Sequence, residues 1–386
     1  MDNQLNINTF TPPLSNKAII GKKQRSSNLE LYRIICMLMI VAHHYVANSG
    51  LATADGPIAI QPFSPNSIYL ALFGAWGKTG INCFMLITGY FMCTSKISFR
   101  KFLKLMLQIY FYKLLIYPIF IISGHETFSI TSFIKLLMPV SGFGPNNFIS
   151  CFIAFWLTIP FWTILVQNIT KRQHQLLLVL LLTCFTLLAS VPSFEVSVNY
   201  ITWFGVIFLI ASYIRLYPSP LLNRKHLWGW LTLVSVLLAL LSVLIMTKLS
   251  VFRYRFLEDS NKLFAVLVSV TSFLWFKNMN IKYSKIINAF GAGTFGVLLI
   301  HANSRVRPWL WKDLVDCVGH YALPLGELIL YSVCVVLAIF VICNLIDQLR
   351  ISTLEKWFFK WYDKKYADRA EAFVSRIING KQKANL

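Results

Sequence analysis

Charged residues are scarce in this sequence. They make up 13% of its 386 residues, about half the share of roughly 25% that is usual in soluble domains. Hydrophobic residues make up 56% of the chain. This composition excludes an ordinary soluble protein and predicts an all-α, polytopic integral membrane protein.

Acidic residues are the scarcest charged class, with 15 Asp and Glu against 36 Lys and Arg and a net charge of +21. Nucleic-acid binding would need a basic face on a soluble fold, and the sequence offers none. Membrane topology explains the excess instead, because lysine and arginine accumulate in cytoplasmic loops. We therefore expect the lipid bilayer as a partner and no nucleic acid.

Ten apolar runs divide the chain, each near the length that a tilted helix needs to cross a bilayer. They lie at 31–48, 68–93, 105–123, 148–168, 176–192, 200–216, 227–247, 261–277, 286–303 and 326–347. With the N-terminus inside, most of the 36 lysines and arginines fall in cytoplasmic segments. The sequence thus predicts about ten transmembrane helices with both termini in the cytoplasm.

The eight cysteines form no CxxC or CxxH pair, and almost all of them lie within the apolar runs. This irregular spacing argues against a zinc site or a disulfide framework. We expect the cysteines to be buried as small hydrophobic side chains, and we predict no metal site.

Two polar segments flank the predicted membrane domain at 29–350. The segment 1–28 has no apolar core before a small-residue cleavage site, so we expect a disordered cytoplasmic arm rather than a signal peptide. The segment 351–386 mixes aromatic and basic residues at helical spacing. That pattern is typical of a basic amphipathic helix on the inner membrane surface.

Arg33 and His44 interrupt the first apolar run, where charged and titratable groups are costly. Their spacing puts them about 20° apart around the helix axis and about 16 Å apart along it. They therefore share one helix face. His43 lies about 80° off that face, whereas Glu30, one turn before Arg33, can pair with the guanidinium.

The two side chains suit complementary tasks. A neutral imidazole takes a proton from a hydroxyl near neutral pH, and a guanidinium binds phosphate or polarises a carbonyl. Together Arg33 and His44 indicate group transfer from an anionic donor to an alcohol. A structural alternative stays open, because an arginine can extend to the interface and a histidine on a helix face is often structural.

Further candidates lie near the ends of the runs. Lys78 and Asn82, in a glycine-containing segment, are candidates for binding the acceptor; the alternatives are close helix packing and, for Lys78, an interfacial position. Arg100, Lys101 and Lys104 can hold the phosphates of a soluble cofactor, or they are ordinary positive-inside anchors.

The predicted outer loops add a second set of candidates. Asn147 and Ser150 follow a turn-rich stretch and either line an outer cavity or cap a helix. Arg253 and Arg255 alternate with phenylalanine and tyrosine, which suits an acidic saccharide or interfacial anchoring. His301 closes the ninth run near the outer face, where a structural role is the default.

The stretch NLELYRIICMLMIVAHH resembles the first-helix pattern of the membrane-bound acyltransferase-3 family, an arginine followed after ten residues by a histidine, here Arg33 and His44. GINCFMLITGYFM resembles a glycine-containing family stretch, with Thr88 replacing a serine, and NNFISCFIAFWLTIPF resembles another that usually begins with a tryptophan. TFGVLLIHANSRVRPWLW is similar to the family's Tyr-Leu-Ile-His signature, with Leu298 in place of the tyrosine. The likeness spans about 28–350.

This resemblance implies an integral membrane O-acyltransferase that moves an acetyl or other acyl group from cytoplasmic acetyl-CoA to a hydroxyl of a cell-surface or lipid-linked carbohydrate. It implies that Arg33, Arg100 and Lys101 contact this co-substrate, with Lys104 where an arginine is frequent. It also favours a functional role for His301, near the acceptor, over a purely structural one. His44 then either deprotonates the acceptor hydroxyl or carries the acetyl group itself.

The sequence leaves two other functions open. A transporter or flippase for glycan precursors also uses buried polar residues, but such folds commonly show paired half-repeats, and none is visible in the sequence. A structural protein of a polysaccharide-export complex would leave Arg33 and His44 without a purpose. We expect a multi-pass protein of the cell (plasma or inner) membrane and leave a homo-oligomer open.

Overall fold

The structure, a computed structural model, describes residues 26–95, 98–143, 147–194 and 196–379. All regular secondary structure in these ranges is helical, which confirms the predicted all-α class. The arm predicted at 1–28 lies almost wholly outside the described residues, and so does the end of the predicted tail.

The helices follow one another along the chain with short connections. Their bounds are α1 (Ser27–Ala47), α2 (Pro57–Ile60), α3 (Pro65–Phe73), α4 (Gly77–Met92), α5 (Phe99–Ile122), α6 (Ile130–Leu137), α7 (Phe148–Asn168), α8 (Lys171–Leu182), α9 (Tyr200–Leu216), α10 (Lys225–Lys248), α11 (Leu263–Lys277), α12 (Lys285–His301), α13 (Val306–Pro308), α14 (Leu325–Arg350), α15 (Lys356–Lys365) and α16 (Ala367–Asn379). Short π-helical turns are η1 (Thr183–Leu188), η3 (Trp309–Leu314) and η5 (Ile351–Glu355), and 3-10 turns are η2 (Leu221–Asn223) and η4 (Gly319–Ala322).

Six helical segments of the described residues are long and apolar enough to cross a membrane. The number rises to seven if the sharply bent pair Lys285–His301 and Val306–Ala322 forms one span. Helices α9 and α11 are apolar but shorter. Each of the ten predicted runs contains a helix, but the number of ten spans and the orientation of the termini stay predictions.

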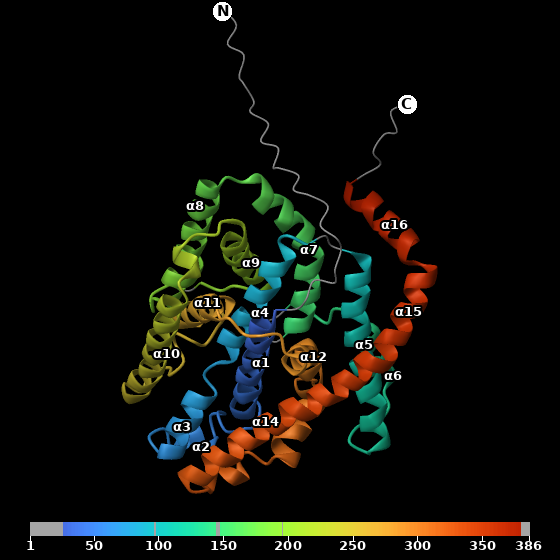
Figure 1. Ribbon diagram of the computed structural model, residues 1–386. Helices are drawn as coiled ribbons and strands as arrows, with labels where there is room; N and C mark the ends of the chain where they lie inside the picture. The colour runs from blue at the N-terminus through green and yellow to red at the C-terminus, as the bar shows by residue number, and fades with distance from the viewer. Residues whose placement is uncertain (1–25, 96–97, 144–146, 195, 380–386) are drawn as a thin grey trace, which may run out of the picture.

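Helix α1 lies in the middle of the bundle, where it packs against α4, α11, α12 and α14 (Figure 1). In its most apolar window 56% of the residues are buried, against 28% in α10 at the periphery. The exposed face of α10 is apolar, as expected of a helix surrounded by lipid. The polar residues Ser27, Asn28 and Glu30 at the start of α1 are buried, and Arg33, His43 and His44 are partly buried.

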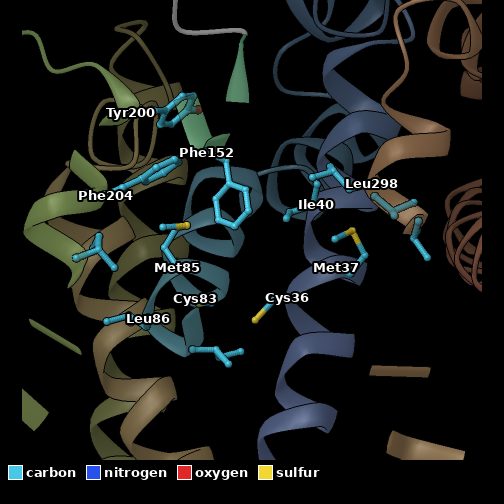
Figure 2. Packing of buried hydrophobic residues seen from close by; sticks show 14 of the residues in the cluster. Cys36, Met37, Ile40, Cys83, Met85, Leu86, Phe152, Tyr200, Phe204 and Leu298 are labelled. Carbon is cyan, nitrogen blue, oxygen red and sulfur yellow. The ribbon is translucent and has the colours of Figure 1, made fainter. Parts of the chain in front are cut away.

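Small side chains fill the space between α1 and α4. Cys36 of α1 and Cys83 of α4 meet there. By contrast, Figure 2 shows Met37 on the side of α1 that faces Leu298 and Leu86 on the side of α4 away from α1. These two cysteines, Met37 and Leu86 are fully buried. Six of the eight cysteines are buried and none forms a disulfide. The predicted role of cysteine as a small hydrophobic residue is confirmed for these six.

Helix α1 begins at Ser27, earlier than the first apolar run. The side-chain amide of Asn28 donates hydrogen bonds to the carbonyl oxygens of Phe276 and Lys277, at 2.9 and 3.0 Å. These carbonyls end α11 and have no partner within their own helix. The polar start of α1 is thus fixed by a distant segment of the chain.

Helix α14 continues through η5 into α15 (Figure 1), so the tail predicted from residue 351 extends the last long span. Phe359 and Tyr362 are buried, whereas Trp357 and Trp361 are exposed. This division agrees with an amphipathic helix. Its position on the membrane surface stays a prediction.

Candidate active site

A cavity of about 450 Å³ lies at the end of the bundle where α1 and α12 end and where α4, α7 and α9 begin. Five of the residues singled out in the sequence line it, namely His43, His44, Lys78, Asn147 and Ser150. They come from α1, α4 and the start of α7. The tertiary fold thus brings together candidates that are far apart in the sequence.

His44 and His301 form a hydrogen-bonded pair beside this cavity. His44 Nδ1 lies 3.0 Å from His301 Nε2, and His301 Nδ1 lies 2.6 Å from the carbonyl oxygen of Val297. Because a carbonyl oxygen only accepts, we assign a proton to Nδ1 of His301, whose Nε2 then accepts the Nδ1 proton of His44. With both rings neutral, Nε2 of His44 keeps a free lone pair.

The two histidines have different access to a ligand. His301 is the last residue of α12, and it is fully buried behind the cavity lining. His44 lines the cavity itself. His44 is therefore the member of the pair that a ligand can reach, and His301 orients it.

His43 has a different partner. Its Nδ1 lies 2.7 Å from the carbonyl oxygen of Gly74, which directs the ring toward the junction of α3 and α4. A Cβ atom at Gly77 would collide with the His43 ring. Only glycine at this position allows α4 to approach α1 so closely.

Lys78 is held in the cavity wall by two neighbours. Its Nζ donates a hydrogen bond to the Tyr200 hydroxyl at 2.8 Å and lies 3.4 Å from a carboxylate oxygen of Asp259. Tyr200 also lines the cavity, although the sequence did not single it out. Lys78 is thus a partnered cation in the wall of the site.

Arg33 forms the predicted ion pair with Glu30, with 2.9 Å between Nη1 and Oε1. The face that it shares with His44 continues through Met37 and Ile40, and both of these residues line the cavity. Arg33 is not among the described residues that line the cavity. Arg33 and His44 therefore share a helix face, but of the two only His44 borders this cavity.

The basic residues at the start of α5 lie near the C-terminal helices rather than at the cavity. Arg100 donates two hydrogen bonds to the Asp363 carboxylate, at 2.8 and 2.9 Å. Lys104 Nζ lies 2.5 Å from a carboxylate oxygen of Glu355, and Lys101 is exposed. This cluster is separate from the histidine site.

The remaining candidates lie outside the cavity lining found in the described residues. The amide of Asn82 is used between elements: it donates to the Ser260 carbonyl at 2.6 Å and accepts from the Trp203 indole at 2.9 Å. Arg253 donates to a backbone carbonyl, and Arg255 belongs to the same loop. The structure thus assigns Asn82 a packing role and leaves the two arginines away from the site.

A buried charged network was not anticipated from the sequence. Asp347, which is fully buried, contacts Nε of Arg350 at 2.7 Å and accepts a hydrogen bond from the Tyr112 hydroxyl at 2.7 Å. Arg350 also pairs with Glu355 at 2.8 Å. A Cβ atom at Gly296 of α12 would collide with Asp347, so this packing is tight. An acidic residue at the end of the last apolar run was the available signal.

Two further cations in the cavity wall, Lys113 and Arg307, were also missed. Lys113 interrupts the third apolar run, which is the same signal that drew attention to Arg33. Arg307 lies in an outer segment with several basic residues, and nothing in the sequence separates it from them.

The membrane-length apolar helices indicate a multi-pass membrane protein, and the histidine pair that opens on a cavity is its candidate active site. The chain belongs to the acyltransferase-3 family, since the family model described as an acyltransferase domain matches residues 26–347. Neither a curated protein nor a solved structure matches it. In the described part of the chain, no group of three or more His, Cys, Asp or Glu side chains could hold a metal ion.

Proposed function

We propose that this protein transfers an acetyl group from acetyl-CoA to a hydroxyl of a cell-surface or lipid-linked carbohydrate. The observation that carries the proposal is the His44–His301 pair, which leaves a free lone pair on a histidine that lines the cavity. Family membership supports acyl transfer as the reaction. Asn147 and Ser150 in the lining suit the hydroxyl groups of a carbohydrate.

In the proposed reaction, Nε2 of His44 takes the proton of the acceptor hydroxyl while that oxygen bonds to the acetyl carbonyl carbon. His44 then returns the proton to the sulfur as the carbon–sulfur bond breaks, which releases the thiol. His301 holds the His44 ring in the tautomer and orientation that this step needs. The same lone pair could attack the acetyl carbon directly, which would give an acetyl-histidine intermediate.

We further propose that the protein crosses the cell membrane ten times with both termini inside, so that the cavity is at the outer side. Acetyl-CoA supplies an activated thioester from the cytoplasm. Arg33, Arg100 and Lys104 are the residues of the inner end that suit its phosphates. The Arg100 and Lys104 side chains are 47% and 43% exposed, so phosphates can reach them in exchange for their carboxylate partners.

The direct test uses the purified protein in proteoliposomes with radiolabelled acetyl-CoA and a cell-surface glycan extract. We expect label on the glycan, at a hydroxyl that mass spectrometry of the product identifies. Proton-dependent movement of glycan precursors without any acetylation would contradict the proposal and support a transporter.

Replacing His301 with alanine is expected to lower kcat about 100-fold with little change in the acceptor KM, because the His44 ring loses the group that orients it. Glutamine at this position offers an oxygen to accept the His44 proton, so His301→Gln should recover part of the rate. Steady-state kinetics of both variants provide the check. Equal loss in both variants, or a change in KM alone, would contradict a positioning role.

A further inference from the structure

The polar part of the cavity wall carries an excess of positive charge. Three cationic side chains line it, Lys78, Lys113 and Arg307, and its described lining contains no aspartate or glutamate. They come from α4, α5 and α13, so the fold gathers them from separate helices. A cluster of this kind, enclosed by apolar walls, attracts an anion more strongly than the same charges would in water.

The three cations differ in how far the protein already neutralises them. Lys78 has the Asp259 carboxylate at 3.4 Å. Lys113 donates only to a neutral group, the backbone carbonyl of Met138, at 2.9 Å. The Arg307 side chain has no hydrogen-bond or ion-pair partner among the described residues. Two positive charges are therefore left for a ligand.

We infer that the acceptor carries an anionic group, a carboxylate or a phosphate, that Arg307 and Lys113 hold while its hydroxyl lies at His44. This inference rests on the proposed function, which it deepens by naming the class of acceptor. The planar fork of Arg307 matches the two oxygens of a carboxylate or phosphate, and Lys113 adds a second charge. Asn147 and Ser150 remain for the neutral hydroxyls of the sugar.

This arrangement places the acidic-saccharide contact at residues other than Arg253 and Arg255. Those two lie outside the cavity lining of the described residues, whereas Arg307 and Lys113 share the cavity with His44. Recognition of charge and chemistry at the hydroxyl thus occur within one enclosed space. An acceptor without the anionic group would leave both cations unpaired in the cavity, at a cost in affinity.

The test uses the full-length protein in phosphatidylcholine nanodiscs and two matched probes, p-nitrophenyl β-glucuronide and p-nitrophenyl β-glucoside. They differ only in a carboxylate against a hydroxymethyl group. Isothermal titration calorimetry without acetyl-CoA should show that the glucuronide binds at least about tenfold more tightly. A second pair, glucose 6-phosphate and glucose, tests a phosphate in the same way.

Variants assign the preference to residues. Arg307→Gln should remove the preference for the anionic probe and leave the affinity for the neutral probe unchanged, whereas Arg307→Lys should keep part of it. Lys312→Gln is the matched control, because it removes an exposed cation of the neighbouring η3 turn that does not line the cavity. Lys113→Gln provides a second variant if Arg307→Gln does not fold.

Three results would overturn the inference. The first is the absence of an Arg307-dependent preference in both probe pairs. The second is that Arg307→Gln lowers kcat alone, and equally for anionic and neutral acceptors. The third is Arg307-dependent competition by vesicles that contain phosphatidylglycerol, which would make the site a lipid headgroup site. Because binding is measured without turnover, a preference for the anionic probe without acetyl transfer would reject the proposed function and keep only an anion-binding site at Arg307. Equal acetylation of the anionic and the neutral probe would support the proposed function and reject the inference.

Discussion

His44→Ala should lower the rate of acetyl transfer by about 100-fold to 10,000-fold, the range that a positioned general base contributes. His44 is the histidine of the pair that lines the cavity, and its Nε2 lone pair has no substitute once the ring is removed. The rate is measured as acetyl transfer by purified protein in proteoliposomes. The melting temperature of each variant shows whether it has folded.

His226→Ala is the matched control, because His226 is an exposed histidine at the start of α10. We expect its activity to equal that of the unchanged protein. Near-normal activity of the His44 variant would remove this residue from the chemistry. Intact-protein mass spectrometry after addition of acetyl-CoA separates the two routes, since only covalent catalysis leaves an acetyl group on the chain.

Asp347→Ala should destabilise the protein by about 3 kcal/mol, the low end of the cost of breaking a buried ion pair, because the buried Arg350 loses one of its two carboxylate partners. Arg350, which is 2% exposed, would keep Glu355 but lose its contact at 2.7 Å with Asp347. The Tyr112 hydroxyl would lose its acceptor as well. The expected result is a marked fall in melting temperature and in the monodisperse fraction in detergent.

Asp313→Ala provides the control for this experiment, since Asp313 is exposed. The double variant Asp347→Asn with Arg350→Met removes both charges and keeps an acceptor for Tyr112, so it should regain part of the lost stability. If the single variant melted like the unchanged protein, the network would not hold α14 in place.

Helix α1 shows how far sequence reasoning reaches. The pairing of Glu30 with Arg33 and the shared face of Arg33 and His44 depend only on helix periodicity, and the ion pair is confirmed. The all-α class follows from composition in the same way. The first-helix pattern of Arg33 and His44 also carried the family resemblance, which the family match confirms.

Other parts of the site could not be derived in this way. The sequence placed Asn82 among the acceptor-binding residues, yet its amide is used by Ser260 and Trp203, which come from other segments. His301 and His44 are 257 positions apart and meet only because α12 packs against α1. The choice between a structural and a functional histidine depended on that contact.

The sequence by itself determined that this chain is helical, that it is suited to a membrane, and that α1 carries an arginine and a histidine on one face. These are local properties, because they depend on composition and on spacing along one helix. The tertiary structure alone decided that His44 meets His301, that Arg307 and Lys113 share its cavity, and that Arg33 does not. Such contacts depend on how separate helices pack, which no single segment specifies.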